Sequence, residues 1–189
     1  MKEVNMRTIV IFITVIVLIV AAGLADSEAD DKPTLYTAYN MWKNSKMKCI
    51  NYKEGDDILP AGTEVRSVRI IQQTIAFTTV NDGKTYTVGF TQRWHPKKSA
   101  DDYRKMMFTT KNFAELTEGL SEMEISAIKK GVLVNGMSKR AVFICYGPPP
   151  EHHTPILDVK TWYYWKNRGE KFAVKFDRNN KLVSDSSGG

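Results

Sequence analysis

Residues 121–124 read Ser-Glu-Met-Glu, and residues 138–147 read Ser-Lys-Arg-Ala-Val-Phe-Ile-Cys-Tyr-Gly. The first stretch is a capping box, in which the serine side chain accepts from the backbone amide three residues on and the glutamate reaches back to the serine amide. It predicts a helix that ends at Gly131, because glycine readily takes the left-handed conformation that closes a helix. The second stretch predicts a shorter helix that ends at its glycine, directly before three prolines.

Three strands are expected after these helices, at residues 161–166, 171–177 and 181–184. The turns between them are rich in Asn, Asp and Gly, so the strands should form an antiparallel meander. Phe172 and Val174 alternate with smaller or charged residues, which predicts that one face of this sheet is buried under the two helices.

The first half of the chain reads as short strands with a period of two, at residues 65–70, 75–79 and 86–90. Residues 81–83, Asn-Asp-Gly, predict a tight hairpin between the second and third of these strands. Further candidate strands lie at residues 35–42 and 46–52, so that about five strands form a small barrel or curled sheet. A short helix is then expected to begin at Ser99, because Asp102, three residues later, can complete a capping box with it.

Several motifs of the second half occur together in a known family. The family has a Gly-Met-Ser/Thr turn that opens the second helix, an inward valine, a Gly-x-Pro turn and a Trp-x-Tyr strand. The matching residues here are Gly136-Met137-Ser138, Val142, Gly147-Pro148-Pro149 and Trp162-Tyr163-Tyr164. Residues 112–184 therefore resemble the SmpA/OmlA (BamE-like) domain, which implies a two-helix plus antiparallel three-stranded sheet domain that docks on envelope proteins or lipid. The family's lipobox cysteine is missing, and a strand-rich segment precedes the matching part.

A second likeness lies at residues 59–65, Leu-Pro-Ala-Gly-Thr-Glu-Val, which resemble the entry segment of bacterial SH3-like barrels. Together the two resemblances predict an α+β protein, with a strand-rich SH3-like N-terminal segment followed by a BamE-like domain. The expected division is a signal peptide at 1–25, a flexible leader at 26–33, the SH3-like part at 34–96, a linker segment at 97–111, the BamE-like part at 112–184 and a disordered tail at 185–189.

Export is indicated by residues 8–24, which carry no charge and follow Lys2 and Arg7. The run ends in Gly23-Leu24-Ala25, so cleavage after Ala25 is expected, and an uncleaved membrane anchor is the alternative. The formal net charge of +6 favours contact with anionic surfaces such as lipid headgroups or cell-wall polymers. The expected location is therefore the periplasm or a membrane-associated part of the envelope.

No nucleophile elbow, zinc-protease or phosphate-loop motif occurs in the sequence. The predicted function is therefore a non-enzymatic envelope binding or scaffolding protein without cofactor or metal, whose partners are envelope proteins or an anionic surface rather than nucleic acid. The alternatives are a module that binds cell-wall glycan or peptide, as SH3-like domains do, and a hydrolase with a dispersed site. A structure in which His95 lies beside His152 and a buried carboxylate would favour the hydrolase. The sequence does not indicate the oligomeric state.

Candidate partner-binding residues lie on and beside the strand Trp162-Tyr163-Tyr164-Trp165. Alternation puts Trp162 and Tyr164 on one face and Tyr163 and Trp165 on the other, so one pair is core. The other pair, with Lys160 and Lys166 beside it, suits a partner surface unless that face is covered as well.

Two further residue pairs raise open questions. The adjacent histidines His152 and His153 lack the ligand number and spacing of a zinc site, and an exposed loop is expected there. Cys49 and Cys145 are either joined by a disulfide or free, with Cys145 acting as a small buried apolar residue.

Overall fold

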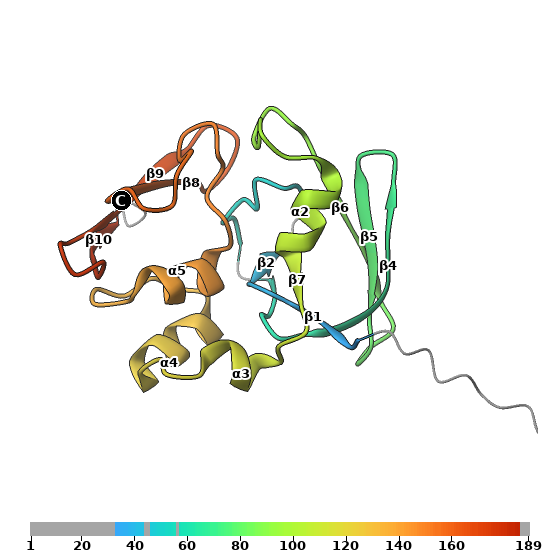
Figure 1. Ribbon diagram of the computed structural model, residues 1–189, viewed down its shortest axis with the longest axis horizontal. Helices are drawn as coiled ribbons and strands as arrows, with labels where there is room; N and C mark the ends of the chain where they lie inside the picture. The colour runs from blue at the N-terminus through green and yellow to red at the C-terminus, as the bar shows by residue number, and fades with distance from the viewer. Residues whose placement is uncertain (1–32, 44–45, 56, 186–189) are drawn as a thin grey trace, which may run out of the picture. The chain divides into compact units, whose positions relative to one another are not determined.

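The computed structural model describes residues 33–43, 46–55 and 57–185. The predicted signal peptide, the leader up to residue 32 and the tail from residue 186 lie outside the described residues. The described residues from Thr34 onward form one compact unit of helices and antiparallel sheets, which confirms the α+β class (Figure 1). No helix in the described part of the chain has the length and apolar character that a membrane span needs.

A five-stranded antiparallel sheet is built from strands between residues 35 and 109, in the spatial order β6-β5-β4-β1-β7. Its predicted hairpin is confirmed, since β5 and β6 pair on either side of the Asn-Asp-Gly turn, whose Gly83 has a φ of 66°. The helix α2 (Ala100–Met107) begins at Ser99 with the predicted capping box. The strands are β1 (Leu35–Thr37), β4 (Glu64–Ile71), β5 (Thr74–Thr79), β6 (Thr85–Gly89) and β7 (Phe108–Thr109).

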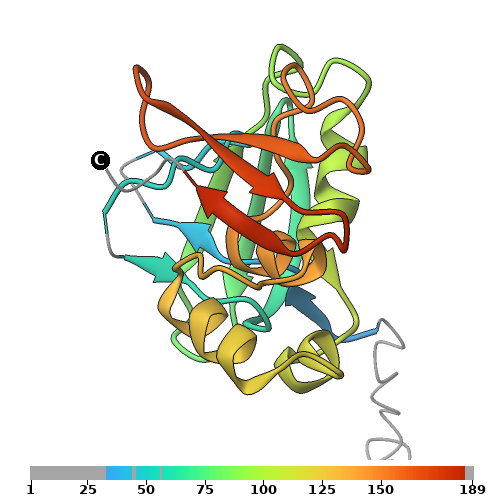
Figure 2. The same ribbon diagram turned by 90° about the vertical axis from the view of Figure 1, so that its left-hand side faces the viewer.

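The second half contains the predicted meander, with strands β8 (Thr161–Trp165), β9 (Lys171–Phe176) and β10 (Leu182–Asp185) in the order β10-β9-β8. Figure 2 shows this sheet in front of the helix α5 (Lys139–Tyr146), with α4 (Glu122–Lys130) below. Its inward residues pack with both helices in one core, as the alternation predicted. A separate pair of two-residue strands, β2 (Met41–Trp42) and β3 (Ile58–Leu59), completes the sheets.

Local capping signals set the ends of α4 and α5. Ser121 and Glu124 form the predicted capping box, and Gly131 closes α4 in the left-handed conformation. The positive φ of 66° favours glycine at position 131, and a Cβ there would lie 2.2 Å from Ile58 Cδ1, so the end of the Ile58 side chain would have to shift. One helix was not predicted: α3 (Phe113–Thr117), which begins at the capping box of Asn112 and Glu115.

The two predicted parts share their packing. Phe143 of α5 contacts both hydrophobic cores, and Trp42 from the first half belongs to the core of α4, α5 and the meander. Asn40 ties the same regions together, because its Nδ2 donates to the Ile128 carbonyl at 2.7 Å and its backbone amide donates to the Ile144 carbonyl at 3.0 Å. These hydrogen bonds fix α4 and α5 against the N-terminal strands.

Both cysteines are free and buried. Cys145 is fully buried on the inner face of α5, which confirms the expectation for that residue. Burial raises the pKa of the Cys145 thiol to about 12 and that of Cys49 to about 11. Both side chains therefore stay protonated and act as small apolar residues.

A buried lysine lies where the two halves meet. Lys53 Nζ donates to the backbone carbonyls of Asn51 and Tyr146, each at 2.6 Å. It also lies 4.4 Å from the ring centroid of Trp42 and 5.4 Å from that of Tyr164. Desolvation by burial lowers the pKa of Lys53 well below its usual value. We refer to this arrangement as the Lys53 cage.

Candidate functional site: an apolar groove with cationic walls

The aromatic strand β8 has the predicted two faces. Trp162 and Tyr164 lie in the core, with exposed fractions of 2% and 0%. On the other face, Trp165 is only 8% exposed, whereas Tyr163 is half-buried. The ring of Trp165 is covered by His152, with centroids 4.9 Å apart, and by Trp94 at 6.1 Å. Of the two aromatic residues on this face, only Tyr163 is therefore partly open to solvent.

The two lysines proposed beside that pair have other contacts. Lys160 Nζ donates to Asn180 Oδ1 at 2.8 Å, and Lys166 pairs with Glu170 at 3.5 Å. The cation nearest the aromatic face is Lys171, whose Nζ lies 5.1 Å from the Tyr163 ring centroid and 5.8 Å from that of Trp165. Lys171 is the cross-strand partner of Trp165 in the meander. The pairing register of the hairpin β8–β9 is therefore the feature that would have indicated this lysine from the sequence.

The histidines do not converge on a metal-binding arrangement. His152 is half-buried against Trp94 and Trp165, and His153 is exposed. His95 is fully buried, with Nε2 3.3 Å from the Cys49 carbonyl, and desolvation lowers its pKa to about 4. Glu151, the nearest acid in the His95 surroundings, forms an ion pair with Lys98 at 2.8 Å. Among the described residues, no three His, Cys, Asp or Glu side chains group as metal ligands would.

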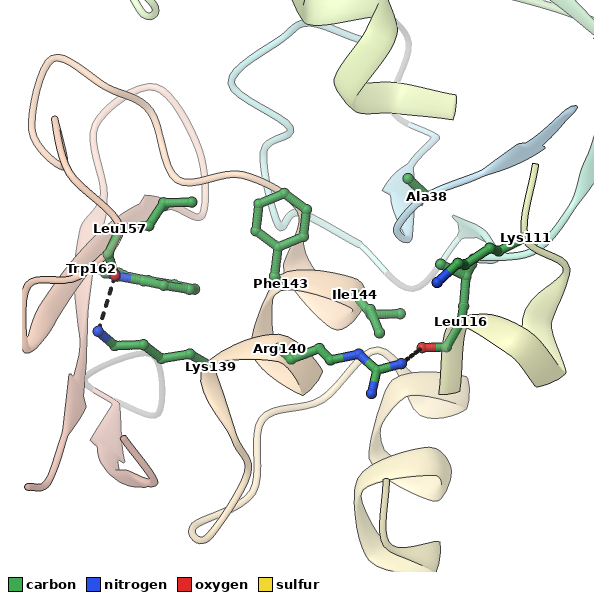
Figure 3. A pocket seen from close by; sticks show the side chains of 9 residues that line it. All are labelled: Ala38, Lys111, Leu116, Lys139, Arg140, Phe143, Ile144, Leu157 and Trp162. Carbon is green, nitrogen blue, oxygen red and sulfur yellow. Dashed lines mark hydrogen bonds between the residues drawn. The ribbon is translucent and has the colours of Figure 1, made fainter. Parts of the chain in front are cut away.

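A groove of about 420 Å³ lies across the outer face of α5 (Figure 3). Its volume falls within the range of about 300 to 1,000 Å³ that is typical of ligand sites. Leu157 and Trp162 form one wall, Leu116 and Ala38 lie on the opposite side, and Phe143 projects between them. The complete lining is Ala38, Lys111, Leu116, Lys139, Arg140, Phe143, Ile144, Leu157 and Trp162.

Lys139 holds the Trp162 side of the groove. Its Nζ donates to the backbone carbonyls of Leu157 at 3.0 Å and Asp158 at 2.9 Å. The indole Nε1 of Trp162 donates to the same Leu157 carbonyl at 3.0 Å. Desolvation lowers the pKa of Lys139, and the nearest carboxylate oxygen, on the exposed Asp158, is 3.9 Å away. The loop is thus held by neutral carbonyls rather than by a close ion pair.

Arg140 holds the opposite side in the same way. Its Nη2 donates to the Leu116 carbonyl at 2.6 Å and its Nη1 to the Glu118 carbonyl at 2.7 Å. These two carbonyls lie at the C-terminal end of α3, where backbone acceptors have no helical partner. The two consecutive cations of α5 therefore hold different walls of the groove, Lys139 the wall with Leu157 and Arg140 the wall with Leu116.

The position of α5 depends on Glu124, which is 4% exposed. Its carboxylate accepts from the Ser138 backbone amide at 2.7 Å and from the Ser121 amide at 3.0 Å. Burial opposes ionisation of this carboxyl, but the hydrogen bonds from Ser121 and Ser138 outweigh it and lower the pKa to about 2. Ser138 in turn caps α5 by accepting from the Ala141 amide. A single carboxylate thus fixes the start of both helices.

The groove combines an apolar surface with positive charge. Its lining holds Lys111, Lys139 and Arg140 but no acidic residue. Leu157 is 45% exposed, and its neighbour Ile156 is 62% exposed, so the apolar surface continues beyond the wall. Exposed apolar surface with a polar border is typical of a binding site. Sequence reasoning missed this site because its lining comes from four separate segments.

Comparison of the chain with protein-family models, with curated proteins and with solved structures returned no match.

Proposed function

We propose that this chain is an exported, non-enzymatic binding protein of the cell envelope and that its groove holds the partner. The groove carries this proposal. Its walls are fixed before any ligand arrives, because Lys139 and Arg140 fasten them to α5. A site that is already ordered loses less conformational entropy on binding.

The location in the envelope rests on the charge-free run at residues 8–24 and the small residues that follow it. The BamE-like arrangement of residues 112–184 is part of the same proposal. It is supported by the order of α4, α5 and the three-stranded meander, which is the order that the SmpA/OmlA resemblance implies. In that family the small domain docks on envelope proteins or lipid, and we propose the same mode of action here.

Photo-crosslinking in the native host tests both parts. A photoreactive phenylalanine analogue replaces Leu116 in the groove in one variant, and Gln73, in the exposed turn between β4 and β5, in a matched control. Both full-length chains carry a carboxy-terminal tag. Mass spectrometry of the purified chain gives its amino terminus, and cell fractionation gives its location.

We expect a mature chain that begins at Asp26, in the envelope fraction, with adducts at position 116 that are absent at position 73. An intact Met1 in the membrane fraction would indicate the uncleaved anchor and keep the binding proposal. Retention of the chain in the cytoplasm would refute export. Equal adduct patterns at the two positions would refute the groove as the binding site.

A further inference from the structure

No acidic residue in the described part of the chain lines the groove, and the exposed Asp158, outside the lining, lies 3.9 Å from Lys139 Nζ. Lys111 makes no side-chain hydrogen bond or ion pair with any described residue, and Arg140 uses its donors on backbone carbonyls. The Lys139 ammonium is likewise held by carbonyls. Arg140 uses two of its five N–H donors on the carbonyls of Leu116 and Glu118, and Lys139 uses its ammonium, which carries three donors, on two carbonyls. The groove therefore offers both charge and free donors to an anionic ligand.

The three cations lie on both sides of the groove rather than at one end. Figure 3 places Lys139 on the Trp162 side, whereas Lys111 and the guanidinium of Arg140 lie on the side of Ala38 and Leu116. A lipid brings its charge at a headgroup, on one end of its apolar part. A peptide can carry carboxylates at several positions along one apolar face, so the spread of cations fits a peptide better.

The apolar residues between the cations suit the same ligand. Phe143 lies between Lys139 and Lys111, with Leu157 on one wall and Leu116 on the other, so a ligand that spans the groove meets both apolar and cationic groups. An amphipathic helix that lays one face in a hydrophobic groove meets this demand, with apolar anchors three and four residues apart.

From this geometry we infer that the groove binds an acidic amphipathic segment of a partner protein, with carboxylates at Lys111, Lys139 and Arg140 and apolar anchors against Phe143 and Leu157. This inference rests on the proposed function and adds the chemical class of the partner. Lys139 and Arg140 have two roles, since they order the walls and contact the ligand. Lys111 has only the second of these roles, contact with the ligand.

Selection from a phage library of random peptides tests the class without knowledge of the natural partner. The bait is the purified mature chain. Selected peptides are synthesised, and their affinities are measured for the parent chain, Lys111→Glu, and the double variant Lys139→Gln/Arg140→Gln. The matched control is Lys129→Gln/Lys130→Gln, which removes two consecutive cations from α4, outside the groove lining.

We expect the selected peptides to combine Asp or Glu with large apolar residues. Lys111→Glu should weaken their binding by about tenfold or more, because close charge pairs at interfaces are often coupled by more than a factor of ten. Since Lys111 has no side-chain partner to lose, this variant leaves the walls in place. The double variant should weaken binding at least as much, the α4 control should leave it unchanged, and added salt should weaken it.

Peptides without acidic enrichment, or binding that Lys111→Glu leaves unchanged, would overturn the inference. So would a chain that selects no groove-dependent peptide. Vesicles of phosphatidylcholine with phosphatidylglycerol are the competing probe. Vesicle binding that depends on Lys111 and Arg140, with no such peptides, would assign the groove to lipid. The proposed function would survive that result, and it would also survive cross-linking at position 116 to a partner segment without acidic residues. If neither cross-linked partners nor groove-dependent peptides were found, both proposals would fail.

Discussion

The Lys53 cage and the groove both place basic side chains on aromatic or apolar surface. They differ in whether those side chains remain accessible to a ligand. Lys53 is buried and directs its amino group to two carbonyls and the faces of surrounding rings. Lys139 and Arg140 also donate to carbonyls, but they border a groove that is open to a ligand. The same chemistry thus supports the fold in one place and presents charge in the other.

This difference teaches that a cation's role follows from its remaining donors and its access, not from its residue type. Removal of the enclosed cation leaves buried carbonyls without a donor, which water cannot reach. Removal of a groove cation leaves carbonyls at an open surface, where water can replace the donor. Stability should therefore depend strongly on Lys53 and weakly on the groove pair, whereas binding should show the reverse.

The largest effect is expected for Lys53→Ala. The substitution removes two buried hydrogen bonds and leaves a cavity among the rings, so the free energy of unfolding should fall by about 3 kcal/mol. Urea denaturation of the mature chain measures this loss. Lys53→Met, which fills the space but donates no hydrogen bond, is the matched control and should lose less. Equal losses in both variants would assign the effect to the hydrogen bonds alone, and no loss in either would contradict the role of the cage.

Glu124→Gln should have an intermediate effect, because Glu124 positions the helix that carries both groove cations. Its carboxylate accepts from the Ser121 and Ser138 amides and lies 3.6 Å from Lys181. The neutral amide keeps part of this hydrogen bonding, and we expect a loss of about 1 to 2 kcal/mol. Urea denaturation at neutral pH measures it.

The pH dependence of that loss provides an independent check. The pKa of Glu124 is about 2 in the folded chain, below its ordinary value of 4.5. Its ionised form therefore contributes stability that is fully present above pH 4.5 and is lost as the pH falls toward 2. The difference between the parent chain and Glu124→Gln should shrink over that window. A difference that stays constant from pH 6 downward would contradict the assignment.

Helices and sheets were predictable wherever the signal was local. Ser121, Glu124 and Gly131 fix α4 through contacts within a few residues, and the alternation in β8 separated its two faces correctly. The helix α3 was also within reach, since Asn112 and Glu115 form a capping box at the usual spacing. The two-residue strands β3 and β7 were not, because only their pairing partners define them.

The binding site was harder to predict for the same physical reason. Alternation indicated that Trp165 faces away from the core, but it could not show that His152 and Trp94, from distant loops, cover its ring. The groove likewise needs segments from four parts of the chain side by side. Lys139 and Arg140 were visible only as consecutive charges at the start of a helix. Their opposite directions became apparent from the carbonyls that each one reaches.

The smallest effects on stability are expected for Lys139→Gln and Arg140→Gln. Each loses hydrogen bonds to carbonyls at the open groove, so each should change the free energy of unfolding by no more than about 1 kcal/mol. Arg140→Gln should lose the more of the two, because desolvation already disfavours the charge of Lys139. Hydrogen exchange locates the change: Arg140→Gln should speed exchange in α3, and Lys139→Gln in the loop that carries Leu157. A loss as large as that of Lys53→Ala in either variant would show that the groove pair supports the fold, and the contrast between the two regions would then no longer hold.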